Sequence, residues 1–252
     1  MKKILVANWK MNLSGSQSVS LAEKIKKRIS GFSKVKLILA PAFPFLNQTE
    51  KIISGSAVSL AGQNLAPWKE GDYTGEVSAD NLKEVGCSYA IVGHAERRGY
   101  FNENNDLINK KIDQTLSAGL TPILCVGENY REKEKKQTGS VLGRQIREGL
   151  QKIKGFPEAD LIIAYEPVWA IGGEKSLAPE EMQSIFMTIK KNLTNLYSEK
   201  FFDEKVKVLY GGSVDGDKAS AFWENDFVDG LLVGGAGLNF DSLYKVAVAN
   251  RL

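Results

Sequence analysis

The sequence predicts an α/β fold in which parallel strands alternate with amphipathic helices and close into a (β/α)8 barrel. Eight short apolar runs recur along the 252 residues, and segments with helical periodicity separate them. The runs are apolar on both faces, as in parallel strands covered by helices. Because no linker or low-complexity break interrupts the alternation, we expect a single barrel domain over residues 1–252, a length that such barrels commonly have.

The expected strands are rich in aliphatic and β-branched residues. In chain order they are Ile4–Ala7, Lys36–Ala40, Val58–Ala61, Tyr89–Val92, Pro122–Val126, Leu161–Tyr165, Val206–Tyr210 and Gly230–Val233. A doubly wound sheet is the other arrangement that this alternation permits. It would be favoured by a G-x-G-x-x-G motif after the first strand, but Asn-Trp-Lys-Met-Asn (8–12) stands there, so the barrel is preferred.

The segments between the runs carry apolar residues at helical spacing. Their stripes are Leu21, Ile25 and Ile29; Ile108, Ile112 and Leu116, before Gly119; Leu142, Ile146 and Leu150; and a longer one from Met182 to Leu196. Pro179, with Glu180 and Glu181 in the first turn, is expected to open the last of these helices. The charge run Arg131–Lys136 alternates in sign and predicts a solvated helical face.

The composition is that of an ordinary globular protein, with 43% hydrophobic and 25% charged residues. The formal net charge is only +3, from 33 basic and 30 acidic residues, and no basic block lacks interspersed acids. Nucleic acid and membrane surfaces are therefore not expected as partners, whereas a local cationic pocket for an acidic metabolite remains open.

Cysteine and histidine usage argues against a metal cofactor. Cys87 and Cys125 fit no metal-ligand spacing, and the chain has one histidine. The apolar run near the N-terminus, Ile4–Ala7, is too short for a secretory signal, and no long apolar run occurs elsewhere. We therefore expect a cytoplasmic protein with reduced thiols.

The strongest candidate for a catalytic group is Glu166. It directly follows the apolar run Leu161–Tyr165, and Pro167 behind it cannot donate to a sheet, so the strand must end there. The segment that follows is apolar and ends in Gly172-Gly173, as a hinged lid over a water-excluding site would. In the alternative reading, Glu166 is only a solvated strand-end residue and Trp169 belongs to the core.

Further polar residues fall at the C-terminal ends of expected strands. Asn8 and Lys10 follow the first strand and His94 follows the fourth, so in a barrel they would meet Glu166 at one mouth. The N-terminal end of the helix expected after His94 would disfavour an imidazolium, and a neutral ring can donate a hydrogen bond to a substrate oxygen. Lys10 is interpreted as a fixed positive charge facing an anionic ligand; the alternative is a lysine whose amine reaches solvent.

Two glycine pairs follow the last two expected strands. They lie in Tyr210–Ser213 and Val233–Gly237, each before a helical segment. Exposed backbone N–H groups near a helix N-terminus form a nest that suits phosphate, and loops after strands seven and eight commonly bind phosphate in such barrels.

Taken together, these motifs resemble those of the triosephosphate isomerase family, and the resemblance extends over the whole length of the chain. The segments that carry the resemblance are Asn8–Asn12, Tyr73–Ser78, Gly93–Arg98, Cys125–Glu128, Ala164–Gly172, Tyr210–Val214 and Gly234–Ala236. The resemblance implies a single-domain TIM barrel and an isomerase that interconverts dihydroxyacetone phosphate and glyceraldehyde 3-phosphate without a cofactor.

The resemblance also implies roles for individual residues. Glu166 would be the base, His94 the electrophile that polarises the carbonyl, and Lys10, with Asn8 beside it, would stabilise the enediolate and the phosphate. Further substrate contacts would come from Gly172, Ser213, Gly234 and Gly235. The long loop Gln63–Ser78 would dock into a second subunit with Thr74 at its tip, which implies a homodimer.

Four positions depart from the family pattern. Ala95 replaces a serine whose hydroxyl would hold the resting base, which leaves the resting position of Glu166 open. Gly173 and Glu174 change the lid tip and bring an extra carboxylate toward the phosphate. Gly237 replaces a serine that could cap a helix, although glycine is itself a fair N-cap. We expect retained activity with altered loop kinetics.

Two other functions are weighed against the isomerase. One is a non-catalytic phosphate-binding barrel, against which the intact set of Asn8, Lys10, His94 and Glu166 argues. The other is a Schiff-base aldolase, which needs a catalytic lysine inside a strand. Lys207 is the one obvious strand lysine, and it is expected to face the helices.

Overall fold

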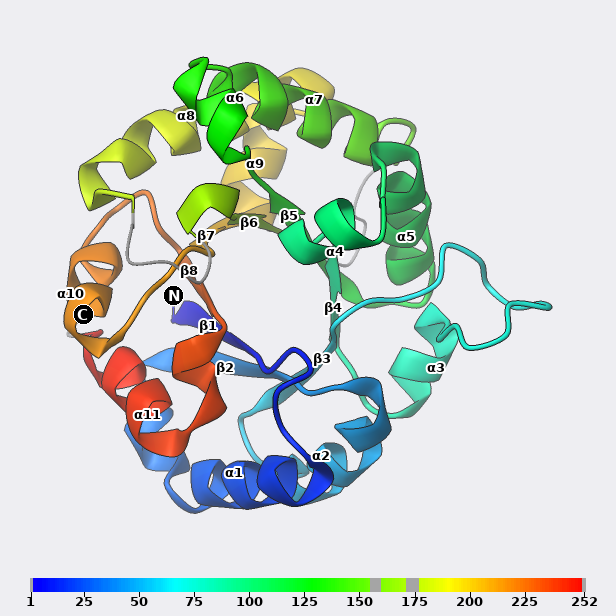
Figure 1. The fold of residues 1–252 in the computed structure, drawn as a ribbon, viewed down its shortest axis with the longest axis vertical. Helices are drawn as coiled ribbons and strands as arrows, with labels where there is room; N and C mark the ends of the chain where they lie inside the picture. The colour runs from blue at the N-terminus through cyan, green and yellow to red at the C-terminus, as the bar shows by residue number, and fades with distance from the viewer. Residues whose placement is uncertain (1, 155–159, 171–176, 251–252) are drawn as a thin grey trace.

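The computed structural model describes residues 2–154, 160–170 and 177–250, and in it eight parallel strands close into a barrel (Figure 1). The strands follow one another around the barrel in sequence order, and β1 pairs with β8 to close it. Their bounds are β1 Lys3–Asn8, β2 Val35–Ala40, β3 Ser59–Gly62, β4 Tyr89–Val92, β5 Thr121–Val126, β6 Leu161–Tyr165, β7 Val206–Tyr210 and β8 Gly230–Val233. The predicted fold class, a TIM barrel, is confirmed.

The strands are apolar on both faces because each separates two hydrophobic layers. On β1, Ile4 and Val6 belong to a cluster inside the barrel, while Leu5 and Ala7 belong to the layer between barrel and helices. The inner cluster combines Ile4, Val6, Ile38, Ala40, Ala61, Tyr89, Ile91, Ile123, Cys125, Ile162, Ala164, Leu209 and Leu232. Side chains therefore fill the barrel, and the space for a ligand lies at its rim.

Helices surround the barrel, as Figure 1 shows. The α-helices are α1 Gly15–Lys27, α2 Leu46–Ile53, α3 Ala79–Glu84, α4 Ala95–Tyr100, α5 Asn105–Ser117, α6 Tyr130–Glu134, α7 Thr138–Leu150, α8 Met182–Leu196, α9 Glu199–Lys205, α10 Gly216–Trp223 and α11 Phe240–Val248. Short 3-10 helices are η1 Ile29–Phe32, η2 Phe43–Phe45, η3 Val168–Ala170, η4 Pro179–Glu181 and η5 Gly235–Leu238. Side-chain caps define several starts, including a capping box between Ser14 and Gln17 at α1.

Three sequence expectations need correction at this level. The helix expected to include Ile29 ends at Lys27, and the 3-10 helix η1 begins at Ile29. Pro179 opens the short η4, whereas α8 begins at Met182. The charge run is not wholly solvated, because the Lys133 ammonium lies 3.2 Å from the ring centroid of Trp169, where a cation–π contact favours it.

Lys207 is a fourth correction. It pairs with Ile162 and lies two residues before Leu209 on β7, and both of these residues belong to the inner cluster. Because successive strand residues point to opposite faces, Lys207 faces the inside of the barrel and not the helices. It lies near the start of β7, at the end opposite the rim where His94 and Glu166 follow their strands, which argues against a Schiff-base role.

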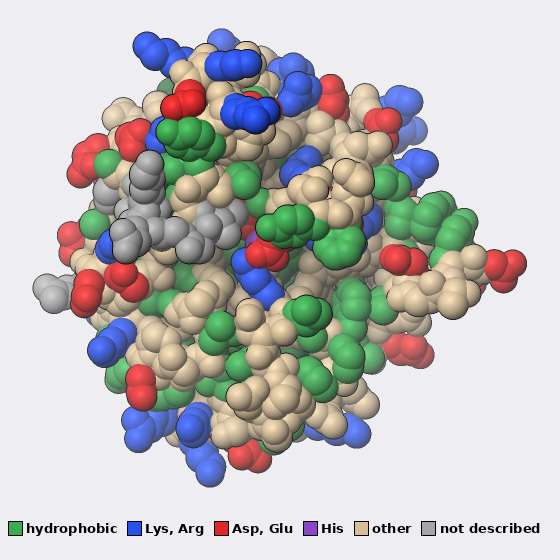
Figure 2. Space-filling view, viewed as in Figure 1, with side chains coloured by type: hydrophobic (Ala, Val, Ile, Leu, Met, Phe, Trp, Pro, Cys, Tyr) green, Lys and Arg blue, Asp and Glu red, His purple; other side chains and the backbone are tan. Residues whose placement is uncertain are grey.

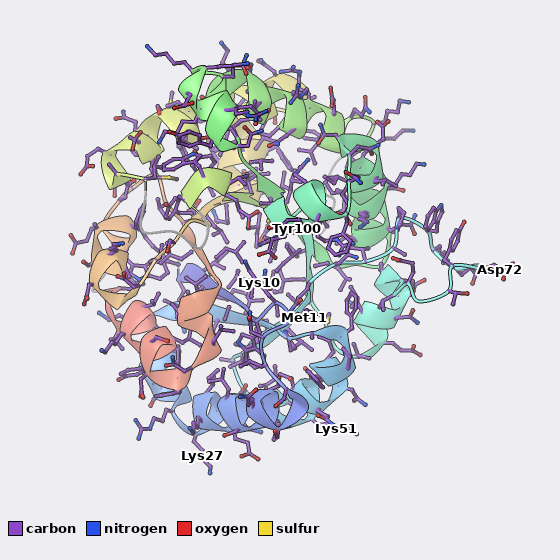
Figure 3. The ribbon with its side chains drawn as sticks, viewed as in Figure 1. Lys10, Met11, Lys27, Lys51, Asp72 and Tyr100 are labelled. Atoms are coloured by element: carbon purple, nitrogen blue, oxygen red, sulfur yellow. The ribbon has the colours of Figure 1, made fainter. Side chains whose placement is uncertain are left out.

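The loop between β3 and α3 projects farthest from the barrel, and Asp72 marks its outer end in Figure 3. Within it, the rings of Trp68 and Tyr73 stack 3.8 Å apart and nearly parallel. Gly71 and Gly75 turn the chain there with positive φ angles. Among the described residues, none of the helices combines the length and the apolar character needed to cross a membrane.

Candidate active site

A cavity of about 460 Å³ opens at the C-terminal ends of the strands, and it collects residues that are far apart in sequence. Its lining includes seven predicted site residues, namely Asn8, Lys10, His94, Glu166, Ser213, Gly234 and Gly235. Lys10 lies near the centre of the barrel mouth in Figure 3. Gly172, the remaining predicted contact, lies outside the described residues, as do Gly173 and Glu174.

Glu166 is a buried carboxylate held by two donors. Its side chain accepts the backbone N–H of Ala95 at 2.9 Å on Oε2, and His94 Nε2 lies 3.1 Å from Oε1. The residue is only 2% exposed. Its backbone N–H still donates to the Val126 carbonyl, whereas Pro167 has no N–H to donate, and β6 ends at Tyr165, just before the acid. The position of the resting carboxylate, which the sequence left open, is thus fixed by the main chain of Ala95.

His94 is oriented by the start of α4. Gly93 turns the chain out of β4 with a φ of +71°, and His94 then forms the N-cap of α4. The backbone N–H of Glu96 donates to His94 Nδ1 at 3.2 Å. Because a ring nitrogen that accepts this bond carries no proton, Nε2 is the donor of a neutral imidazole, and it points at Glu166.

Lys10 sits in a backbone conformation that non-glycine residues seldom adopt, with a φ of +51°. Asn8 Oδ1 accepts the backbone N–H of Lys10 at 3.1 Å, and the side-chain amide of Gln63 donates to its carbonyl at 2.9 Å. The ammonium forms an ion pair with Glu96. Asn8 and Gln63 therefore stabilise the strained turn that brings this cation to the cavity.

The two glycine-rich loops differ in how their following helices begin. Asp215 caps α10, and its carboxylate accepts the backbone N–H groups of Asp217 and Lys218. Gly234 precedes η5 without any side-chain cap. The loop after β8 therefore leaves more of its backbone donors for an anion than the loop after β7.

Gly237 does not lie at a helix start, contrary to the sequence expectation. It is inside η5, and Asn239 is the N-cap of α11, with its side chain accepting the N–H of Ser242. A Cβ at Gly237 would lie 3.1 Å from the Cβ of Ala7 on β1, which is a tight contact. Glycine at this position therefore relieves crowding and does not replace a cap.

Sequence reasoning missed the roles of four residues around the site. Glu96 and Gln63 position Lys10, and Gly211 and Gly127 make room for Glu166. A Cβ on Gly211 would lie 2.9 Å from Glu166 Cγ, and one on Gly127 would lie 1.8 Å from the Glu166 carbonyl oxygen. Only their occurrence next to strand ends could have suggested them, since the contacts depend on how neighbouring strands pack.

The described residues contain no group of three or more histidine, cysteine or acidic side chains that could hold a metal ion. Both thiols are buried and unpaired with each other. Burial raises the pKa of Cys87 to about 12 and raises the pKa of Cys125 well above its ordinary value. Neither thiol is therefore poised as a thiolate nucleophile.

Comparison with known proteins decides the family. A family model described as triosephosphate isomerase matches residues 3–250. The chain belongs to the triosephosphate isomerase family. Relatives in this family are named triosephosphate isomerase, which is an aldose–ketose isomerase, so the predicted enzyme class is confirmed.

Relatives in the family match almost end to end. The protein named triosephosphate isomerase from Endomicrobium trichonymphae is 41% identical over 245 residues, which cover 97% of each chain. The same-named protein from Dictyoglomus thermophilum is 38% identical over 245 residues, 97% of this chain and 98% of the relative. That from Prosthecochloris aestuarii is 42% identical over 249 residues, 98% of each chain.

Proposed function

We propose that the protein interconverts dihydroxyacetone phosphate and D-glyceraldehyde 3-phosphate by proton transfer through an enediolate. The observation that carries this proposal is the placement of a buried carboxylate 3.1 Å from an imidazole nitrogen, in one cavity with Lys10 and two glycine-rich loops. The family membership of the chain supports the choice of a phosphorylated triose.

Glu166 would act as the base. Removing a proton from a carbon next to a carbonyl requires a carboxylate within reach of that carbon and shielded from water. Glu166 is buried, and its oxygens accept from Ala95 N–H and lie beside His94 Nε2. Both bonds can be exchanged for contacts with a substrate that enters between the base and the imidazole, so the resting geometry supports this role.

His94 and Lys10 would stabilise the negative charge that develops on the substrate oxygens. The neutral imidazole presents Nε2–H as a donor, since its Nδ1 already accepts from Glu96. Lys10 adds a positive charge at the same cavity, and its backbone is held in place by Asn8 and Gln63. Donors fixed before the reaction stabilise such charge best because they need no reorganisation.

The phosphate would bind where the loops after β7 and β8 meet the cavity wall. Ser213, Gly234 and Gly235 line it there, and Gly234 leaves η5 without a side-chain cap. A Cβ on Gly234 would lie 3.4 Å from Lys10 Cε, so the cation borders this loop. The same ammonium could then neutralise part of the phosphate charge.

The base is tested with Glu166→Gln, which keeps the shape of the side chain but cannot accept a proton. In a coupled assay with glyceraldehyde 3-phosphate, we expect kcat to fall by about a thousandfold, because general base catalysis is lost. Circular dichroism should show an intact fold. Glu84→Gln, on the exposed face of α3, is the matched control and should retain wild-type turnover.

The same assay decides between the isomerase and a non-catalytic phosphate-binding barrel. If the wild-type protein binds inorganic phosphate but converts neither triose phosphate, the result would favour the non-catalytic phosphate-binding barrel. Glu166→Gln with wild-type turnover would remove Glu166 from the role of base while leaving the family assignment intact.

The second part of the proposal is a homodimer formed through the loop that carries Thr74. This loop projects from the barrel and exposes Trp68 and Tyr73, and the exposed side chains of Met11 and Tyr100 lie near the barrel mouth in Figure 3. Figure 2 shows hydrophobic side chains both around the mouth and on the projecting loop. Such surface is unusual on a monomer and suits a second copy.

Sedimentation measures the mass directly. We expect twice the chain mass of 27.7 kDa for the wild type and a monomer for Thr74→Arg, which adds a charge at the loop tip. A monomeric wild type at working concentration would contradict the dimer. A cytoplasmic location stays a prediction from the sequence.

A further inference from the structure

Arg98, which the reaction does not use directly, donates hydrogen bonds to three separate elements. From α4, its Nε donates to the Gly93 carbonyl at 2.8 Å, its Nη1 to Asn105 Oδ1 at 2.7 Å and its Nη2 to the Cys125 carbonyl at 3.1 Å. Burial lowers the pKa of this guanidinium, and the negative charges of Glu166 and Glu103 oppose the shift. A partly buried cation with three fixed acceptors is rarely incidental.

The guanidinium bridges two neighbouring strands where their own pairing ends. The ladder between β4 and β5 closes with Val92 opposite Leu124. The residues that follow this last pair are Gly93 after β4 and Cys125 on β5, and Arg98 donates a hydrogen bond to the carbonyl of each. It therefore replaces the sheet hydrogen bonds at the rim with a side-chain crosslink.

Both bridged carbonyls lie one residue from the catalytic machinery. His94 follows Gly93, and Ala95 N–H, which holds Glu166, comes next. On the other side, Val126 follows Cys125 and accepts the backbone N–H of Glu166 at 2.8 Å. The distance between the His94 side and the Glu166 side of the site thus depends on the span of one guanidinium.

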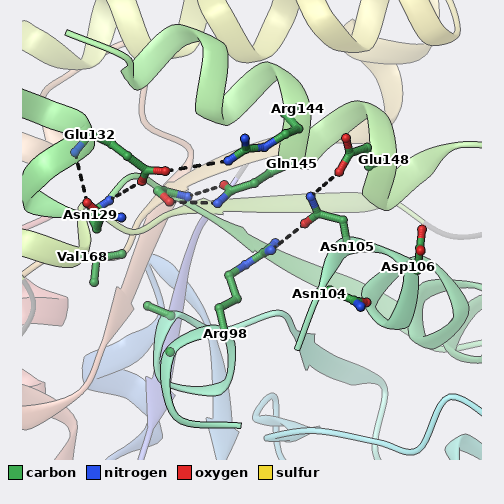
Figure 4. A pocket seen from close by; sticks show the side chains of 13 residues that line it. Arg98, Asn104, Asn105, Asp106, Asn129, Glu132, Arg144, Gln145, Glu148 and Val168 are labelled. Atoms are coloured by element: carbon green, nitrogen blue, oxygen red, sulfur yellow. Dashed lines mark hydrogen bonds and ion pairs between the residues drawn. The ribbon is translucent and has the colours of Figure 1, made fainter. Parts of the chain in front are cut away.

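We propose that Arg98 is a positioning residue for the isomerisation: by bridging Gly93 and Cys125, it sets the separation at which His94 and Ala95 N–H both reach Glu166. Asn105 orients the guanidinium and is itself held by Glu148 at 2.7 Å, so the arrangement extends from α4 through α5 to α7 (Figure 4). This inference rests on the proposed role of Glu166 as base.

A second cavity gives experimental access to the crosslink. It has a volume of about 480 Å³ and is lined by Arg98 together with Ala95, Gly127, Gln145, Arg144 and neighbouring residues (Figure 4). Truncating Arg98 to alanine would open a guanidinium-sized space next to this cavity. A guanidinium ion from solution can then enter and restore the bridge.

The experiment compares Arg98→Ala with wild type in steady-state kinetics. We expect kcat to fall about thirtyfold while KM changes less than about threefold, because the reacting groups and not the phosphate contacts are displaced. Guanidinium chloride below denaturing concentrations should raise kcat of the variant several-fold and leave wild type unchanged. Sodium chloride at the same ionic strength and urea at the same concentration should have no such effect.

Arg144→Ala is the matched control. It removes a second guanidinium from the same cavity, but Arg144 contacts Glu132 at 3.7 Å and is more than half exposed. Its kcat should stay within about twofold of wild type, as for other exposed ion pairs. Arg98→Lys keeps the charge without the planar fork and should recover only part of the loss.

Each outcome bears on the proposal. Wild-type kcat in a folded Arg98→Ala protein, or a loss that matches the unfolded fraction and is not rescued by guanidinium, would overturn it. If Arg98→Ala does not fold, Asn105→Ala tests it instead: a severalfold fall in kcat at unchanged KM supports the proposal, and no change refutes it. An inactive wild type would instead refute the proposed function, so the two failures are distinguishable.

Discussion

One half of the cavity is lined mainly by side chains, and the other half is lined mainly by backbone. On the side of β1, β4 and β6, the groups that face a ligand are side chains: Asn8, Lys10, His94 and Glu166. On the side of β7 and β8, they are mostly main chain, with glycines at 211, 212, 234 and 235. In the proposed reaction, the first half would supply the base and the charge, and the second half would supply space and N–H donors.

This difference shows where each half is vulnerable. The side chains of the first half hold one another, as when His94 and the N–H of Ala95 share the two oxygens of Glu166. The second half depends on the absence of side chains, so an added methyl group tests it directly. Glycine-to-alanine substitutions therefore allow the two halves to be compared. Their expected effects depend on how close the new Cβ would come to its nearest neighbouring atom and on whether that atom can move.

The largest effect is expected at Gly127, which follows β5 and lies against the backbone of Glu166, behind the first half of the cavity. Its Cβ would lie 1.8 Å from the carbonyl oxygen of Glu166 and 2.6 Å from the carbonyl carbon, and backbone atoms cannot move aside cheaply. Gln145 also clamps Gly127 by bonding to both its N–H and its carbonyl. Gly127→Ala should lower kcat at least about a hundredfold through displacement of the base.

Kinetics and thermal unfolding measured together check this expectation. Gly149→Ala in α7 is the control, since its Cβ would meet only side-chain atoms at 3.6 Å or more, and alanine favours a helix. Gly127→Ala with wild-type kcat would mean that the base does not depend on the close approach of the β5 and β6 ends.

The sequence was sufficient for the architecture because local patterns determine it. Runs that are apolar on both faces, such as Leu161–Tyr165, indicated parallel strands covered by helices, and the absence of a G-x-G-x-x-G motif after the first strand favoured the barrel. The strands lie within a residue or two of the predicted ranges. The candidate residues Lys10, His94 and Glu166, which line one cavity, were predicted because each follows a strand. Their convergence then follows from the parallel order.

Contacts between elements were not predictable in this way. Nothing local to Gln63 indicates that it holds the carbonyl of Lys10, and Arg98 reads as one more charge in a short helix. Lys207 was assigned to the wrong face because the pattern Val-Lys-Val-Leu-Tyr does not reveal which set of alternating residues faces the inside of the barrel. These features depend on strand register, which appears only when the barrel is closed.

A smaller effect is expected at Gly212, in the second half. Its Cβ would lie 2.1 Å from the Tyr210 hydroxyl oxygen, and this ring is buried and stacked on Phe222 with centroids 4.2 Å apart. The hydroxyl also accepts the backbone N–H of Leu177 at 3.2 Å. Gly212→Ala should displace the ring, reduce stability by about 1–3 kcal/mol and lower kcat/KM by about tenfold.

Urea unfolding and steady-state kinetics measure the two consequences separately. The fall in kcat/KM should come mainly from KM, because the base and the imidazole belong to the other half. A fall confined to kcat would show that the halves are coupled more tightly than their construction suggests. Tyr210→Phe, which removes only the acceptor for Leu177, provides the comparison for the hydroxyl itself.

The smallest effect is expected at Gly235. A Cβ there would meet no atom of the described residues within 4 Å, and its φ is not in the positive range that strains alanine. Stability of Gly235→Ala should therefore equal wild type within about 0.5 kcal/mol. The bound state is the sharper test, because a phosphate that approaches the bare backbone at η5 would meet the new methyl group. An unchanged melting temperature with a raised KM would locate the phosphate at Gly235, whereas an unchanged KM would move the phosphate toward Gly234 and Ser213.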